Sequence, residues 1–215
     1  MMSLLNEKLD QYIEEHTTSE DAVLQELSRE THLKTYYPRM LSGKVQGKFL
    51  EMIVQMIKPN RILEIGTFTG YSAIALAKGL PENGKIITLE VNPEMEIFIR
   101  KFIEKSGLGN KIELVIGDAV DLIPKMEEQF ELVFIDADKE QYIDYYNLSM
   151  EKLKPGGFIL ADNVLWSGKV LETDKKSDKE TKGIKAFNEF IKNDPRVEQV
   201  IISVRDGLML ARKIV

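Results

Sequence analysis

Hydrophobic positions along the chain follow one spacing before Pro59 and another after it. In the first part the apolar residues recur at helical spacing, which predicts helices at 3–15, 19–33 and 44–57. After Pro59, short apolar runs alternate with amphipathic stretches, which predicts strands separated by helices. The expected strands lie at 61–65, 85–90, 111–116, 130–136 and 157–161.

The N-terminal helices carry apolar stripes, and one of them has a capping residue. Ser19 predicts a capped start for the second helix, because a serine side chain can accept a backbone N–H in the first turn. The stripes consist of Leu5, Leu9, Tyr12 and Ile13 in the first helix, and of Val45, Phe49, Met52, Ile53 and Met56 in the third.

Helices between short apolar strands predict an α/β fold with a doubly wound, mostly parallel sheet. The end of the chain differs, because the runs 197–204 and 208–214 are separated only by Arg205-Asp206-Gly207, which predicts a hairpin. We therefore expect a Rossmann-like sheet of seven strands, with one antiparallel strand at or near its edge.

The length of 215 residues and the hydrophobic content of 43% fit one α/β domain with a substantial core. We expect a single domain over 1–215, with the N-terminal helices of 1–57 as a lid or dimer region and 58–215 as the cofactor-binding and catalytic core. The chain shows no secretory signal and no apolar run of about 20 residues, so a cytoplasmic protein is expected. It contains no cysteine, which excludes disulfides, thiolate metal sites and cysteine nucleophiles.

The formal charge of −6 argues against a general nucleic-acid binder, which needs a basic face to contact phosphates. One segment, 169–182, is rich in lysine, but acidic residues interrupt it. We expect a solvated loop there, with a substrate-facing lid as the alternative. Its lysines include Lys175, Lys176, Lys179 and Lys182, and its acids include Asp174, Asp178 and Glu180.

Oxygen ligands follow two of the expected strands at the point where each strand ends. Asp136 ends the fourth strand, and Asp162 and Asn163 follow the fifth. Because neighbouring parallel strands lie about 4.8 Å apart and ligands bind beyond their carboxyl ends, these three side chains are expected to converge. Oxygen ligands favour magnesium, calcium or manganese. Lys139 would place an amine beside this metal.

The first strand leads into a glycine loop, Glu64-Ile-Gly-Thr-Phe-Thr-Gly-Tyr-Ser72, and then into a helix. Gly66 and Gly70 allow the backbone to turn and to approach a ligand at the helix start. A dinucleotide fingerprint needs a third glycine where this chain has Phe68, which disfavours a nicotinamide cofactor. Glu64 would repel a pyrophosphate but suits an ammonium or sulfonium group; its alternative role is a cap or a polar interruption of the strand end.

Acidic residues also end the second and third strands. Glu90 can accept hydrogen bonds from both hydroxyls of a ribose. Asp118 either contacts the same ligand or caps the helix expected at 119–126. Together with Glu64, these acids describe a nucleoside pocket whose ligand need not contain phosphate.

These motifs, in the order in which they follow along the chain, resemble those of the cation-dependent class I O-methyltransferases that use S-adenosylmethionine. This family includes catechol and caffeoyl-coenzyme A O-methyltransferases. The resemblance covers nearly the whole chain. Besides the glycine loop it rests on Phe134-Ile-Asp-Ala-Asp-Lys139, Lys154-Pro-Gly-Gly157, Ala161-Asp-Asn-Val-Leu-Trp-Ser-Gly168 and Asp206-Gly207.

The resemblance implies a chemistry and a set of ligands. It implies S-adenosylmethionine as methyl donor, a divalent cation such as Mg²⁺, a catechol-like acceptor or hydroxycinnamoyl thioester, and a homodimer. The metal ligands would be Asp136, Asp162 and Asn163, with Lys139 as general base. The implied cofactor residues are Ser42, Glu64, Gly66, Thr67, Ser72, Glu90, Asp118, Ala119, Asp136 and Asp138.

Three implied positions keep a second interpretation. Ser167 occupies a substrate-contact position and Trp166 precedes it, but both are alternatively ordinary loop residues. Asp138 is followed at the third position by Gln141, so it also fits a capping box.

Three other functions stay open at this stage. Some bacterial members of the family methylate a hydroxylated uridine of tRNA, although the acidic balance and the lack of an arginine-rich run disfavour that substrate here. A nicotinamide-dependent oxidoreductase and a non-enzymatic nucleoside-binding protein are the other two alternatives.

Overall fold

The computed structural model describes residues 7–173 and 177–214. Among the described residues, those up to Asp118 form one compact unit, called here the N-terminal unit, and those from Ala119 onward form the C-terminal unit. The start of the first expected helix, including Leu5, lies outside the described residues. The same holds for Asp174, Lys175 and Lys176 of the lysine-rich segment.

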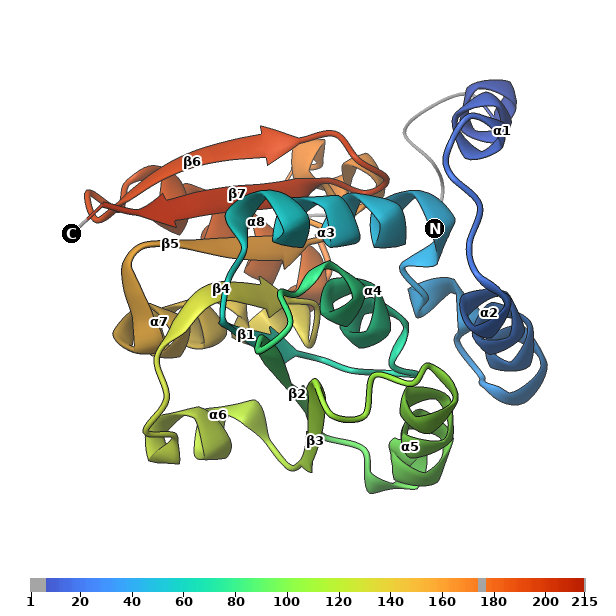
Figure 1. The fold of residues 1–215 in the computed structure, drawn as a ribbon. Coiled ribbons are helices and arrows are strands. Elements are labelled where there is room, and N and C mark those ends of the chain that lie inside the picture. The colour runs from blue at the N-terminus through green and yellow to red at the C-terminus, as the bar shows by residue number, and fades with distance from the viewer. Residues whose placement is uncertain (1–6, 174–176, 215) are drawn as a thin grey trace. The chain divides into compact units, whose positions relative to one another are not determined.

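Seven strands in the described part of the chain form a mixed, mostly parallel sheet (Figure 1). The expected α/β class with one antiparallel strand near the edge is confirmed, because β7 is antiparallel to both of its neighbours and β6 is the last strand. The strand order is β3-β2-β1-β4-β5-β7-β6. The strands are β1 (Arg61–Ile65), β2 (Lys85–Glu90), β3 (Ile112–Ile116), β4 (Phe130–Ile135), β5 (Leu153–Asp162), β6 (Val197–Ile202) and β7 (Leu208–Lys213).

The N-terminal unit contains the parallel strands β1, β2 and β3 with their helices. The helices are α1 (Glu7–Glu15), α2 (Ala22–Lys34), α3 (Gly43–Ile57), α4 (Tyr71–Gly79) and α5 (Glu96–Lys105), with short 3-10 turns at η1 (Pro38–Met40) and η2 (Pro93–Met95). In α1 the predicted stripe is largely exposed at Leu9 and Tyr12.

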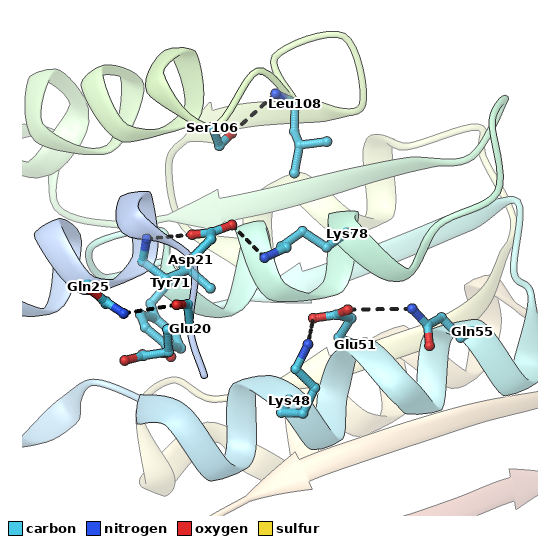
Figure 2. Close-up of polar contacts among 11 residues, drawn as sticks. Glu20, Asp21, Gln25, Lys48, Glu51, Gln55, Tyr71, Lys78, Ser106 and Leu108 are labelled. Atoms are coloured by element: carbon cyan, nitrogen blue, oxygen red, sulfur yellow. Dashed lines mark hydrogen bonds and ion pairs between the residues drawn. The ribbon is translucent and has the colours of Figure 1, made fainter. Parts of the chain in front are cut away.

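The start of α2 is capped by Asp21, so the prediction of a cap at Ser19 is wrong. The Asp21 carboxylate accepts the backbone N–H of Leu24 at 2.9 Å, and its other oxygen pairs with Lys78 of α4 at 2.6 Å (Figure 2). A capping side chain must directly precede the first helical residue to reach the free N–H groups, and Ser19 lies too early in the chain.

The apolar stripe of α3 differs from the side of the helix that is buried. Met52 and Met56 of the predicted stripe are 53% and 74% exposed. The helix instead runs beside α4 (Figure 1) and turns a different face inward, formed by Gln46, Gly47, Leu50 and Val54. A Cβ atom on Gly79 of α4 would lie only 2.4 Å from the carbonyl oxygen of Glu51, so the two helices approach closely on this side.

A pair of substitutions distinguishes the buried face of α3 from its exposed face by their effects on the free energy of unfolding. Leu50 is fully buried, so Leu50→Ala should lower the free energy of unfolding by about 2–5 kcal/mol, through lost burial and the cavity left behind. Met56→Ala should change it by only about 0.5 kcal/mol, because the side chain is largely in solvent. Urea unfolding measures both. Equal losses in the two variants would contradict this packing.

The C-terminal unit contains β4, β5, β6 and β7. Its helical segments are α6 (Ala119–Leu122), η3 (Ile123–Lys125), η4 (Lys139–Gln141), α7 (Tyr142–Lys152), η5 (Trp166–Leu171) and α8 (Lys179–Lys192). The helix expected at 119–126 is thus divided into a short α-helix and a 3-10 turn, since Pro124 has no N–H to continue the helical hydrogen bonds.

The last strands also differ from the expected limits. The strand expected at 157–161 begins earlier, at Leu153, because Leu153 pairs with Phe130 before an irregularity in register lets Phe158 pair with Leu132. The terminal hairpin is confirmed, with Ile202 paired to Leu208, and its strands end one or two residues before the expected limits.

The buried strands end abruptly in polar residues. In β4 the run from Leu132 to Ile135 is fully buried, as is typical of a parallel strand covered on both faces. Asp136 follows directly and is only partly buried. This change places polar side chains at the carboxyl end of the strand, where parallel sheets bind their ligands.

Candidate active site

In the C-terminal unit, the two acids expected to bind a metal lie at the carboxyl ends of neighbouring parallel strands, Asp136 directly after β4 and Asp162 as the last residue of β5. β4 and β5 pair Ile135 with Ala161, so Asp136 and Asp162 are the next residues on each strand. Asp162 is buried, and one of its carboxylate oxygens accepts the backbone N–H of Asn163 at 2.7 Å. The predicted ligands therefore collect at one end of this part of the sheet.

Lys139 lies directly beside Asp136. Its Nζ atom is 2.9 Å from Asp136 Oδ1 and also donates a hydrogen bond to the hydroxyl of Tyr142. The lysine side chain is only 6% exposed. The sequence prediction therefore placed an amine next to a metal-ligand candidate correctly.

Tyr142 is a residue whose role the sequence analysis missed. Its buried hydroxyl donates to the carbonyl oxygen of Asp162 at 3.0 Å, so it connects the amine of Lys139 with the end of β5. Burial, followed by the charges of Asp136 and Asp162, raises the pKa of Tyr142 well above its usual value, so the hydroxyl keeps its proton. The signal in the sequence for this role was that Tyr142 lies three residues after Lys139, a spacing at which side chains of a helical segment can meet.

Asp138 has the capping role that its sequence context suggested. Its side chain accepts the backbone N–H of Glu140 at 3.0 Å, and its second oxygen accepts the amide of Gln141 at 3.4 Å. Capping is therefore confirmed, and contact with a cofactor stays a prediction.

The two candidate substrate residues lie on the loop that follows the metal-ligand candidates. The Nζ atom of Lys139 is 5.9 Å from the ring centre of Trp166. Ser167 is exposed, and its backbone N–H donates to the side chain of Asp206. The loop thus brings Trp166 beside the candidate general base.

In the N-terminal unit, Glu64 belongs to a buried network of hydroxyl groups. It is fully buried and accepts a hydrogen bond from Thr88, its neighbour in register on β2. The hydroxyl of Thr88 lies 2.6 Å from that of Thr67 in the glycine loop. The network fits the interpretation of Glu64 as a polar interruption of the strand, and its contact with a ligand stays a prediction.

Glu90 holds the glycine loop in shape. One carboxylate oxygen accepts the backbone N–H of Phe68 at 2.7 Å, and the other accepts that of Asn92 at 2.9 Å. Phe68 has a φ of 52°, a left-handed backbone conformation that residues other than glycine rarely adopt, and the hydrogen bond from its N–H to Glu90 supports it. Burial raises the pKa of Glu90 against the opposing effect of these hydrogen bonds. The ribose contact of Glu90 stays a prediction.

The other predicted cofactor residues lie at the starts of helices or in loops. Ser42 and Ser72 are buried at the starts of α3 and α4, Gly66 has a φ of 97°, and Asp118 is exposed. Ala119 begins α6 in the C-terminal unit.

The donor set suits a hard cation by its chemistry, since it consists of two carboxylates and one amide oxygen. Within 7–173 and 177–214, no group of three or more His, Cys, Asp or Glu side chains is arranged to hold a metal ion. The predicted set contains only two such residues.

Across residues 7–173 and 177–214, no helix has the length and apolar character needed to cross a membrane.

Comparison with known proteins places this architecture among methyltransferases. A solved O-methyltransferase from Bacillus cereus, in complex with SAH, superposes with a TM-score of 0.88 at 33% identity, over 96% of this chain and 97% of that one. The chain is 34% identical to a catechol O-methyltransferase of Niastella koreensis, over 98% of this chain and 99% of the relative. It is 35% identical to a caffeoyl-CoA O-methyltransferase of Petroselinum crispum, over 98% and 92%.

The fold and these similarities place the chain among the class I methyltransferases that use S-adenosylmethionine. The family model of O-methyltransferases matches residues 14–214. The chain belongs to this family and is an S-adenosylmethionine-dependent O-methyltransferase.

Proposed function

We propose that this enzyme transfers the methyl group of S-adenosylmethionine to a hydroxyl of a catechol-like small molecule or a hydroxycinnamoyl thioester, and that the transfer depends on a divalent cation. The main support is the contact of 2.9 Å between Lys139 and Asp136 beside Asp162. An amine beside paired oxygen ligands suits deprotonation of a hydroxyl. The names of the catechol and caffeoyl-CoA relatives support the acceptor class.

Asp136, Asp162 and Asn163 are the proposed metal ligands. When bound, a divalent cation supplies a Lewis acid that lowers the pKa of a coordinated hydroxyl. Lys139 is proposed to take the hydroxyl proton at Nζ, while the Tyr142 hydroxyl holds the amine in place. Trp166 and Ser167 are proposed to contact the acceptor.

The donor is proposed to be bound through the residues that the family resemblance implies. Glu90 would accept the ribose hydroxyls, and Glu64 would favour the positive charge of the donor. Because transfer requires oxygen, carbon and sulfur to lie in line, their placement is a main contribution of the protein. The residues proposed to bind S-adenosylmethionine are Ser42, Glu64, Gly66, Thr67, Ser72, Glu90, Asp118, Ala119, Asp136 and Asp138.

Removal of metal tests the proposal directly. Labelled S-adenosylmethionine is incubated with a panel of catechols, hydroxycinnamoyl thioesters and bulk tRNA, before and after chelation. Transfer to a dihydroxy aromatic should fall by about 100-fold or more with chelator and return with Mg²⁺, since Lewis-acid stabilisation is worth several kcal/mol. Undiminished transfer after chelation would contradict the metal requirement, and salt-sensitive transfer to tRNA alone would favour the nucleic-acid alternative.

We also propose a homodimer, as the family resemblance implies. Light scattering coupled to size exclusion should give twice the mass of one chain, and a mass of one chain at micromolar concentration would contradict it.

A further inference from the structure

The loop formed by residues 163–168 has an unusual backbone. Asn163, Trp166 and Ser167 have φ angles of 60°, 47° and 52°. Asparagine tolerates this left-handed region, but tryptophan and serine adopt it at a cost in free energy. Such a conformation persists only where surrounding groups hold it, and it is found most often at functional sites.

The turn between β6 and β7 supplies one set of these holding contacts. The side chain of Asp206 accepts the backbone N–H of Ser167, and its carbonyl oxygen accepts that of Leu165 at 2.9 Å. The carbonyl oxygen of Gly207 accepts the N–H of Val164 at 3.1 Å. A Cβ atom on Gly207 would lie 2.4 Å from Leu165, so the turn packs directly against the loop.

A second contact comes from a different element. Asn188 of α8 donates its side-chain amide to the carbonyl oxygen of Val164 at 2.8 Å. The loop is therefore attached by side chains from both the hairpin turn and a helix. Neither attachment is adjacent to the loop in sequence.

The carboxylate of Asp206 is buried in a way that costs folding stability. Its side chain is 2% exposed, and within the described residues its Oδ2 atom has no hydrogen-bond partner. A buried carboxylate oxygen without a partner destabilises the folded protein. Stability alone therefore does not account for a carboxylate at this position.

We propose that Asp206 and Asn188 are positioning residues that hold the 163–168 loop, and thereby Trp166 and Ser167, in the geometry required to receive the acceptor. The role assigned to the loop rests on the proposed function, because that function makes Trp166 and Ser167 acceptor contacts. The attachment itself is a property of the fold and can be measured without turnover.

Trp166 provides the measurement, because it is the only tryptophan of the chain. In Asp206→Ala we expect Trp166 emission to shift to longer wavelength and acrylamide quenching to increase. The KM for the acceptor should rise about tenfold, as expected for loss of one hydrogen bond to a charged group, while the KM for S-adenosylmethionine stays unchanged. Asn188→Ala should change the same quantities in the same direction.

A conservative variant and a matched control separate positioning from general destabilisation. Asp206→Asn keeps an oxygen that can accept the N–H of Ser167, so its emission and acceptor KM should stay within about threefold of wild type. Asp194→Ala removes another carboxylate of the C-terminal unit, one that accepts the N–H of Arg196 at 2.9 Å. It should lower stability without changing Trp166 emission or the ratio of the two KM values.

The proposal is overturned if Trp166 emission and quenching are unchanged in both alanine variants, if both KM values rise equally, or if Asp206→Asn behaves like Asp206→Ala. Should Asp206→Ala not fold, Asn188→Ala decides the outcome, since alanine is favourable in a helix. Emission changes in an enzyme that methylates no acceptor would support the attachment and overturn the proposed function instead.

Discussion

Replacing Asp162 by alanine is expected to lower metal-dependent methyl transfer by roughly 1,000-fold, because the several kcal/mol of stabilisation supplied by the cation would be lost. Asp162 is buried at the end of β5 and supplies one of the two carboxylates of the proposed ligand set. Alanine would leave Asp136 and the amide of Asn163, a donor set with a single negative charge. Hard cations bind weakly to such a set.

Two measurements check this expectation. The transfer rate is followed with labelled S-adenosylmethionine across a range of Mg²⁺ concentrations, and Mn²⁺ binding is followed by electron paramagnetic resonance without turnover. Asp144→Ala is the control, since Asp144 is an exposed acid in the first turn of α7. It should keep the wild-type rate and Mn²⁺ affinity. Wild-type Mn²⁺ binding in Asp162→Ala would rule out the proposed ligand set.

Replacing Lys139 by alanine should lower turnover by about 10²–10⁴-fold, the usual contribution of a positioned proton acceptor. The side chain is buried and contacts both Asp136 and Tyr142, so its amine is held in one place. The proposed residues for binding S-adenosylmethionine are unchanged in this variant. The dissociation constant of the donor should therefore stay within about threefold of wild type.

Steady-state kinetics and calorimetry separate these two effects. Lys192→Ala is the control, because Lys192 is an exposed lysine of α8 that pairs with Glu189 at 3.2 Å. It should change neither quantity. Tyr142→Phe keeps the buried ring but removes the hydroxyl that contacts Lys139, and about a tenfold loss of turnover is expected. Equal losses of donor affinity and turnover in Lys139→Ala would contradict the role of the amine in proton transfer.

The strands were the most predictable part of the fold. The limits expected for β1 and β2 agree with the structure, because continuous apolar runs bounded by polar residues are typical of buried parallel strands. The face of α3 was not predictable in this way. Apolar residues occupy more than one side of that helix, and the close approach to Gly79 selects the side with Gly47 and Leu50.

The candidate site was predictable where its chemistry lies within a few residues of a strand end. The contact between Lys139 and Asp136 joins residues three apart, and the acids at 136 and 162 follow recognisable strands. Asp138 was correctly read as a possible cap because its partner lies close in sequence.

By itself, the sequence determined the alternation of strands and helices, the terminal hairpin and the positions of acids at the strand ends, since all of these depend on local patterns. Tertiary structure alone decided that Glu90 supports Phe68, that Tyr142 connects Lys139 to β5, and that Asp206 and Asn188 hold the 163–168 loop. The side-chain hydrogen bonds among these contacts join residues between 20 and 39 positions apart, except that of Tyr142 with Lys139. No local pattern encodes them, because hydrogen bonds between distant segments depend on how the chain packs.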